Sequence, residues 1–327
     1  GVINMDKLKK VGLTALGTAL VSSSAIAAEM AVTGSAKLTF NGGDKVTSGN
    51  GWSGTDSFNV SASTELDNGF TVSHTQNIGG GGADNNAMTS IGMGAMGTLE
   101  FHHISGSDIV SAWDDMMPSA NEESWDSLTG TVGGNGPTRG AASNNMFRYH
   151  LDVMDGVSIS ASLVPSGTGE AGSSTSYGVK FTGVEGLTVG LVTGENNSEA
   201  AGTGGNTNAA GDTIENTNMY LTYAIDAFTV GIQNNESDSE TANSDYDYRG
   251  YGISYAVSED ISVSYGIGKV EYENSSLLDQ DTSAISASFT NGSVTVSATM
   301  NEGDNLGGAS AATADKKAYE LNIGFAF

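Results

Sequence analysis

Three groups of residues in this sequence have types and spacings that could perform chemistry. The first is the hexapeptide GMGAMG at residues 92–97, which fits the G-x-G-x-x-G pattern of dinucleotide-binding loops. That pattern needs a strand before it, a helix after it and an acidic residue about 20 positions later. Here the following residues, TLEFHH, alternate as a strand does. We therefore interpret the glycines as a tight turn between two strands.

The second group would supply a nucleophile and its base. His102 and His103 lie beside Ser105, and His150 shares a predicted strand face with Asp152. Nucleophilic catalysis needs a base within hydrogen-bond reach of a hydroxyl and a third group that orients the base. The sequence has no G-x-S-x-G motif, and serine is common enough to produce such neighbours by chance. We therefore predict that the protein is not an enzyme.

The third group consists of carboxylates in polar segments, at Asp84, Asp238, Glu240 and Asp245. Carboxylate oxygens suit calcium, but the spacing does not match the D-x-D-x-D-G loop with its distal glutamate. We predict no cofactor and no defined metal site. Divalent cations bound by the acidic loops remain an open alternative.

The composition indicates where the protein is located and which partners it can bind. Residues 1–27 contain three lysines, an apolar segment and the tripeptide AIA, which together predict an N-terminal extension and a cleaved secretory signal. Removing them leaves 9 basic and 37 acidic residues, a formal charge of about −28, which argues against a nucleic-acid partner. The absence of cysteine excludes disulfides and thiolate metal sites from the exported chain.

The elements that must position these residues are strands, because apolar and polar residues alternate with period two from end to end. The sixteen predicted strands cover residues 30–40, 58–66, 69–78, 88–93, 97–103, 144–153, 157–164, 175–182, 187–193, 217–225, 228–234, 246–257, 261–272, 283–290, 293–300 and 317–327. Short connections such as DNG, MDG and NG alternate with long polar ones along the chain. Gly, Asn and Asp supply the positive φ angles that tight hairpins require.

An even strand count, with tight turns on one side and long loops on the other, is typical of an outer-membrane barrel. No later segment offers about 18 consecutive apolar residues. A soluble β-sandwich or β-solenoid is the alternative fold, but neither fold requires connections that alternate in length. We predict an all-β fold in which residues 28–327 form a 16-stranded antiparallel transmembrane β-barrel.

The mature chain resembles the Gram-negative general diffusion porins, most closely those of alphaproteobacteria. The resemblance rests on the first strand AEMAVTGSAKLTF, the hairpin GMGAMGTLEF, the long insertion after the fifth strand and the last strand AYELNIGFAF. It implies short periplasmic turns, long extracellular loops, and a third loop (residues 104–143) folded into the lumen. The last strand would carry the signal read by the barrel-assembly machinery, in Tyr319, Leu321, Ile323, Phe325 and Phe327.

The resemblance also implies a pore constriction with acids on the third loop and bases on the wall. The expected loop residues are Asp108, Asp114, Asp115, Glu122, Glu123, Asp126 and, near its return, Arg139. Strand parity places Lys37, Arg148 and Lys180 inside the barrel. Arg249 and Lys269 have outward parity near the loop ends, which requires either a bulge or an interfacial site.

The function implied is passive passage of small hydrophilic solutes and ions through a water-filled outer-membrane pore. Where relatives carry a Gly-Arg pair, this chain has EFHHI, so a wall base is missing and selectivity leans toward cations. The second to fifth strands have small or polar outward residues, and in general porins this part of the wall packs against neighbouring subunits. The resemblance therefore implies a homotrimer, with lipid and lipopolysaccharide around it. His74 in this region could also respond to protons. A substrate-selective channel with a lumen binding site is the alternative function.

Overall fold

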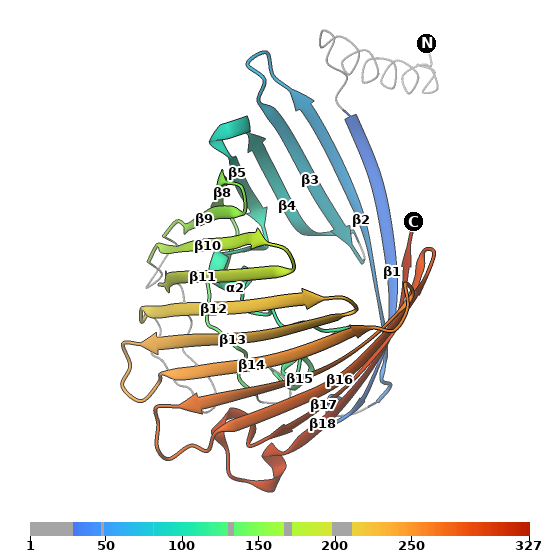
Figure 1. Cartoon of the computed structure of the whole chain (residues 1–327), viewed down its shortest axis with the longest axis vertical. Coiled ribbons are helices and arrows are strands. Elements are labelled where there is room, and N and C mark those ends of the chain that lie inside the picture. The colour runs from blue at the N-terminus through green and yellow to red at the C-terminus, as the bar shows by residue number, and fades with distance from the viewer. Residues whose placement is uncertain (1–28, 47–48, 81, 130–133, 167–171, 198–210) are drawn as a thin grey trace, which may run out of the picture.

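The computed structural model describes residues 29–46, 49–80, 82–129, 134–166, 172–197 and 211–327. The predicted signal segment, residues 1–27, lies outside this part. Sixteen antiparallel strands close into one barrel, in which each strand pairs with its neighbours in chain order and β18 pairs with β1 (Figure 1). This confirms the predicted fold class. In the described residues, no helix is long and apolar enough to cross a membrane.

The wall strands have the following bounds: β1 (Glu29–Gly43), β2 (Trp52–Glu65), β3 (Thr71–Gly79), β4 (Ala83–Gly92), β5 (Thr98–Ile104), β8 (Met146–Met154), β9 (Val157–Val164), β10 (Ser174–Val184), β11 (Leu187–Asn196), β12 (Ile214–Ile225), β13 (Phe228–Ser239), β14 (Tyr246–Ala256), β15 (Ile261–Tyr272), β16 (Gln280–Asn291), β17 (Val294–Asp304) and β18 (Lys316–Ala326).

Each predicted strand has a counterpart in the wall, but several are longer at the end that meets the long loops. β13 was predicted to end at residue 234 and continues to Ser239, and β2 begins at Trp52 rather than at residue 58. The apolar alternation stops where the outward side chains leave the apolar band, whereas the backbone ladder continues beyond it. The alternation in the sequence therefore gives the height of the apolar band rather than the full length of each strand.

The tight turns form as their residue types predict. Gly69, Gly156, Gly186 and Gly292 all have positive φ in the short connections, as does Asp226. The GMGAMG hexapeptide joins β4 to β5 through the 3₁₀ turn η1 (Gly94–Met96). No βαβ unit surrounds it in the described chain, so the interpretation as a tight turn is confirmed.

Large apolar side chains cover the outside of the wall. Their outward parity is regular, for example at Ile253, Tyr255, Val263 and Tyr265. Alternate positions facing inward carry Ser, Thr, Asn and Gly, so one face suits lipid and the other water. The barrel closes where the backbone of Phe327 exchanges hydrogen bonds with Gly34 of β1.

Candidate pore constriction

The third loop enters the barrel through a short two-stranded stalk formed by β6 (Gly106–Ser107) and β7 (Ala142–Ser143). The helix α2 (Ile109–Ala112) follows at once and lies behind β10 and β11 in Figure 1. Its first amide, at Ile109, donates to the Ser176 hydroxyl of β10 at 2.9 Å. This contact fixes the start of the loop against the inner wall.

The loop then crosses the inner faces of successive strands, held by buried polar side chains. Gln233 of β13 accepts from the Met116 amide at 2.9 Å and donates to the carbonyls of Trp113 and Asp114 at 3.0 and 2.7 Å. Asn301 of β17 donates to the Glu123 carbonyl at 2.8 Å. Two further wall residues donate to loop carbonyls, Asn218 to Val110 and Ser286 to Glu122. Two wall hydroxyls accept from the loop, Ser264 from the Ala120 amide and Thr299 from the Asn121 side chain.

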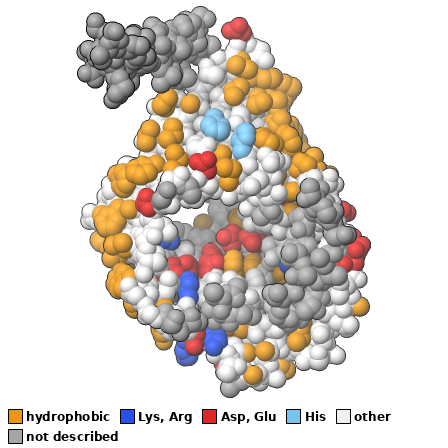
Figure 2. Space-filling view, turned by 180° about the vertical axis from the view of Figure 1, so that it is seen from behind, with side chains coloured by type: hydrophobic (Ala, Val, Ile, Leu, Met, Phe, Trp, Pro, Cys, Tyr) orange, Lys and Arg blue, Asp and Glu red, His pale blue; other side chains and the backbone are white. Residues whose placement is uncertain are grey.

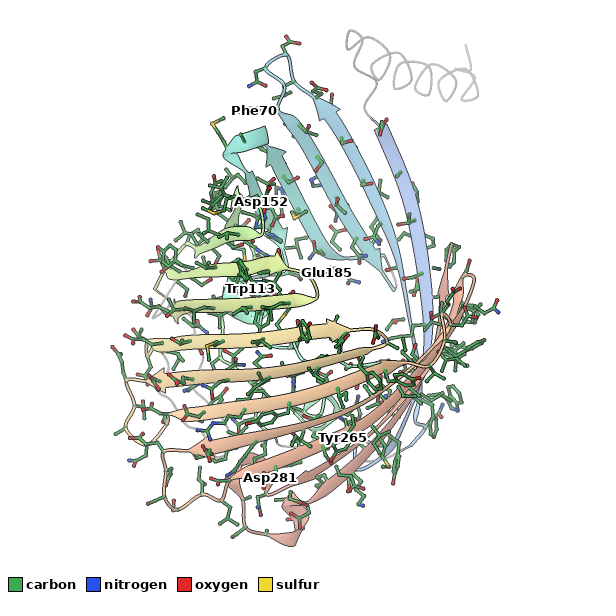
Figure 3. The ribbon with its side chains drawn as sticks, viewed as in Figure 1. Phe70, Trp113, Asp152, Glu185, Tyr265 and Asp281 are labelled. Atoms are coloured by element: carbon green, nitrogen blue, oxygen red, sulfur yellow. The ribbon has the colours of Figure 1, made fainter. Side chains whose placement is uncertain are left out.

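Inward glycines make room for the loop. A Cβ added at Gly178 of β10 would lie 2.7 Å from a Trp113 ring carbon, closer than side chains pack. Gly231 and Gly252 likewise lie beneath Pro118. Trp113, labelled in Figure 3, also meets Tyr220 edge to face. The ring centroids are 5.9 Å apart. The wall and the loop are therefore complementary in shape.

The loop returns along the same side of the barrel. Gln280 of β16 exchanges hydrogen bonds with the backbone of Asn135. Asn235 of β13 donates to the Pro137 carbonyl. The side chains that bind the two arms come from β10 to β17, and Ala141 packs on Met146 at the loop end of β8. In the described residues, no side-chain hydrogen bond joins residues 106–143 to β1 to β5, which form the uncovered part of the wall. Figure 2 shows a central hollow in which acidic and basic side chains are exposed.

Five loop carboxylates, at Asp114, Asp115, Glu122, Glu123 and Asp126, lie close enough together to perturb one another. Burial, and then the neighbouring Asp115, raises the pKa of Asp114 to about 7. Burial and a hydrogen bond with Asp126 raise the pKa of Glu123 to about 9. Burial and the nearby Glu320 carboxylate raise the pKa of Glu122 to about 7. A cation in the passage would relieve this repulsion.

The predicted wall bases have inward parity, as the strand register confirms. Lys37 is exposed on β1, opposite Gly324 of β18. On β8, the Nε of Arg148 lies 3.8 Å from the Glu100 carboxylate of β5. Glu100 also accepts from His102 at 3.1 Å, while His103 faces outward and meets the His74 ring. Lys180 lines a hollow with His150 and Asp152.

Two of the sequence-predicted constriction residues have structural positions instead. Asp108 is only 2% exposed, and its carboxylate accepts from the Ser111 amide as the N-cap of α2. The Arg139 guanidinium donates to the carbonyls of Ser237 and Ser244, each at 3.0 Å, and stacks on Tyr246. Both side chains hold the ends of the loop through these contacts, so we do not count them among the constriction residues.

One residue at the loop was missed by the sequence reasoning. Lys45, from the first long loop, pairs with Glu320 of β18 at 2.7 Å and donates to Ser127 of the third loop at 3.2 Å. It therefore joins the first loop to the third. Parity cannot place a residue that lies beyond the end of a strand, but Lys45 is the one base in residues 41–55, and that could have drawn attention to it.

Ser160, His150 and Asp152 lie in a line on the inner wall. His150 contacts the Ser160 hydroxyl at 3.1 Å and the Asp152 carboxylate at 3.3 Å. Acyl transfer also needs free amide donors for the oxyanion, and here the surrounding amides belong to the β8 to β10 ladders. His150 and Asp152 are also well exposed to solvent. The arrangement therefore lacks the oxyanion site and the dry surroundings of a hydrolase.

A closed barrel with an apolar exterior and a loop folded into its lumen defines an outer-membrane channel protein. The sequence matches the family of Gram-negative porins over residues 12–327, and the chain belongs to that family. No curated protein matches the sequence.

Solved structures with the same fold include OmpT, an outer membrane protein of Vibrio cholerae, with a TM-score of 0.68 and 13% identity. The match covers 93% of this chain and 99% of that one. An anion-selective porin from Comamonas acidovorans has a TM-score of 0.65 and 12% identity, covering 92% of this chain and 100% of that one. A mutant of the Rhodopseudomonas blastica porin has a TM-score of 0.64 and 12% identity, covering 91% and 100%.

Proposed function

We propose that this porin is a general diffusion channel that passes small hydrophilic solutes and ions passively across the outer membrane. The observation that carries the proposal is the position of the third loop, which is hydrogen-bonded to wall side chains from β10 to β17 beside the uncovered wall from β1 to β5. Such a loop narrows a water-filled passage without closing it. We assign the protein to the alphaproteobacterial type of the family.

The constriction lies between two charged surfaces. Asp114, Asp115, Glu122, Glu123 and Asp126 form the loop side, and Lys37, Arg148 and Lys180 form the wall side. The field between them orders the solutes that pass. Glu123 holds a proton at pH 7 because its pKa is about 9. The remaining loop acids, together with Glu100 beside Arg148, outweigh the wall bases, and the channel prefers cations. In this respect it differs from the Comamonas relative, which is described as anion-selective.

A substrate-selective channel is the second candidate. The observation that favours it is the hollow lined by His150, Asp152 and Lys180, where neighbouring charges of both signs could hold a solute. The remaining inward positions on the uncovered wall are mostly serine and asparagine, such as Ser73, Ser90 and Asn77. Because they form no aromatic series, they support diffusion rather than binding.

The assembly is proposed to be a homotrimer in the outer membrane, reached after cleavage of the signal in residues 1–27. Outward positions on β3 and β4 carry His74, Gln76 and Thr89, which suit a neighbouring subunit better than lipid tails. The outward face of β18, from Tyr319 to Phe327, is proposed to be the signal for the barrel-assembly machinery. Lipid and lipopolysaccharide surround the trimer. In the described chain, no group of three or more acidic or histidine side chains could hold a metal ion.

Liposome swelling tests the proposal. Proteoliposomes containing the refolded protein are diluted into isotonic solutions of neutral sugars of increasing size. General diffusion predicts a swelling rate that falls smoothly with solute mass and does not saturate with concentration. Saturation by one sugar, or a rate that depends on solute identity at equal mass, would favour the selective channel instead.

A further inference from the structure

The outward-facing bases of the barrel are confined to one arc of its rim. The described residues include nine lysines and arginines, since three of the twelve in the chain lie in residues 1–27. Three of the nine, Arg249, Lys269 and Lys317, face outward, and all three lie at the loop ends of β14, β15 and β18. No bulge turns them inward, because the ladders from β13 to β17 run without a shift of register. Of the two explanations for their outward parity, a bulge or an interfacial site, the interfacial site is therefore the one that fits.

These bases lie on a sharp border between charge and apolar surface. In the strand register, Arg249 lies directly opposite Lys269. Lys269 lies opposite Asp281, and Asp281 lies opposite Asp304. One step toward the short turns, the outward positions are Tyr251 and Ile267, which are apolar, and then Ser283 and Glu302, which are polar (Figure 3 labels Asp281, and Tyr265 farther along β15). An amphiphile at this border would meet charges with its headgroup and apolar side chains with its acyl chains.

A hollow at the border is lined by both kinds of side chain. Its walls include Arg249 and Lys269 on one side, Asp281, Asp304 and Glu302 on the other, and Tyr251 and Ile267 at the apolar edge. Glu302 is paired with Lys317 at 2.6 Å. The bases and acids therefore face one space over three adjacent strand pairs. A ligand that satisfies all of them carries a negative and a positive charge close together.

The acids on this rim are unequally paired. Lys269 turns away from its cross-strand partner Asp281 and pairs with Glu271 at 3.0 Å and Asp279 at 2.8 Å. Arg249 pairs with Glu271 at 3.2 Å. In the described residues, no base lies within ion-pair distance of Asp281 or Asp304, although these two carboxylates are direct cross-strand neighbours. Like charges in that position are destabilising unless a cation lies between them.

We propose that this hollow binds the headgroup of an outer-leaflet lipid that carries a phosphate next to a positively charged group. Arg249 and Lys269 contact the phosphate, and Asp281 and Asp304 contact the cationic group. The acyl chains lie along Tyr251 and Ile267. Arginine is suited to a phosphate because its planar guanidinium donates two parallel hydrogen bonds. The site rests on the proposed membrane orientation, with the long loops outside.

The test uses the full barrel, refolded in detergent and examined by native mass spectrometry. The probes are phosphatidylethanolamine, phosphatidylglycerol and water-soluble phosphoethanolamine. We expect phosphatidylethanolamine to bind at least about tenfold more tightly than phosphatidylglycerol, because only the former has a cation for the two aspartates. Soluble phosphoethanolamine lacks the acyl chains and is expected not to bind in the same range.

Variants assign the two halves of the site. The double variant Arg249→Gln/Lys269→Gln weakens both lipids, whereas Asp281→Asn/Asp304→Asn removes only the preference for phosphatidylethanolamine. Lys316→Gln is the matched control, because Lys316 lies next to Lys317 in sequence but faces inward and pairs with Asp44. Equal binding of the two lipids, binding of the soluble headgroup alone, or unchanged binding in both double variants would overturn the proposal.

Single-channel conductance of the same preparations separates this proposal from the proposed function. A conducting pore without a headgroup preference refutes only the lipid site. A preparation that binds lipid as expected but does not conduct refutes the diffusion channel and leaves the lipid site standing.

Discussion

Gln233 is the residue whose removal should most directly release the third loop. It is 1% exposed and makes three hydrogen bonds to the loop backbone, with the Met116 amide and with the carbonyls of Trp113 and Asp114. The substitution Gln233→Ala leaves all three groups without these partners. At about 1 kcal/mol net for each bond, the loss is about 3 kcal/mol. Opening of this segment then becomes more frequent by a factor on the order of a hundred.

Hydrogen exchange of the Met116 amide measures that opening, because its acceptor is the deleted side chain. Thr229→Ala is the control, since Thr229 faces inward on the same strand and has no hydrogen bond to the described part of the loop. We expect faster exchange over residues 113–118 in the Gln233 variant alone. Exchange that stays as slow as in the parent protein would refute the claim that buried wall side chains hold the loop.

Three further predictions concern the loop and the last strand. Because burial and Asp126 raise the pKa of Glu123 from 4.5 to about 9, the folded protein holds a proton that the unfolded chain releases across this range, and stability falls as pH rises. Heat unfolding should therefore show that Glu123→Gln stabilises the protein more at pH 9 than at pH 5, and an equal gain at both would contradict this. Gly178→Ala should push the Trp113 ring away from the wall and red-shift the tryptophan fluorescence. Gly54→Ala should leave the fluorescence unchanged, because the added Cβ there makes only ordinary contacts. Identical spectra for the two variants would contradict the packing of Trp113 on Gly178. Phe327→Ser should slow membrane insertion by purified assembly machinery and leave unaided refolding unchanged. Phe289→Ser, which removes another exposed aromatic side chain, should slow neither process. Equal slowing of assisted insertion by both variants would contradict a special role for the last residue.

The wall of the barrel could be predicted because its evidence is local. Each strand has one face toward lipid and one toward water, so parity alone placed Arg148 and Lys180 inside and Tyr319 outside. The same parity placed Arg249 and Lys269 outside, which the register confirms. Strand ends were less predictable, because hydrogen-bonded ladders continue where the apolar alternation stops.

The path of the third loop could not be predicted because its contacts are far apart in sequence. Gln233 lies more than 100 positions from the loop carbonyls it binds. Nothing near Asp108 in the sequence distinguishes a helix cap from a pore acid, and the partners of Arg139 are backbone carbonyls, which have no sequence signature. A charge in a long loop predicts the chemistry available, but only the fold decides whether that charge meets water or backbone.

The measurement that tests the central claim most directly is the reversal potential of single channels in a planar bilayer under a salt gradient, compared between the parent protein and Asp114→Asn/Asp115→Asn. At pH 9, above the raised pKa of Asp114 (about 7), the account predicts stepwise ohmic conductance with a cation preference that weakens in the variant, because two acids of the constriction have lost their charge. Absent conductance would contradict the diffusion channel, and a cation preference unchanged by the substitutions would contradict the placement of the constriction at the third loop.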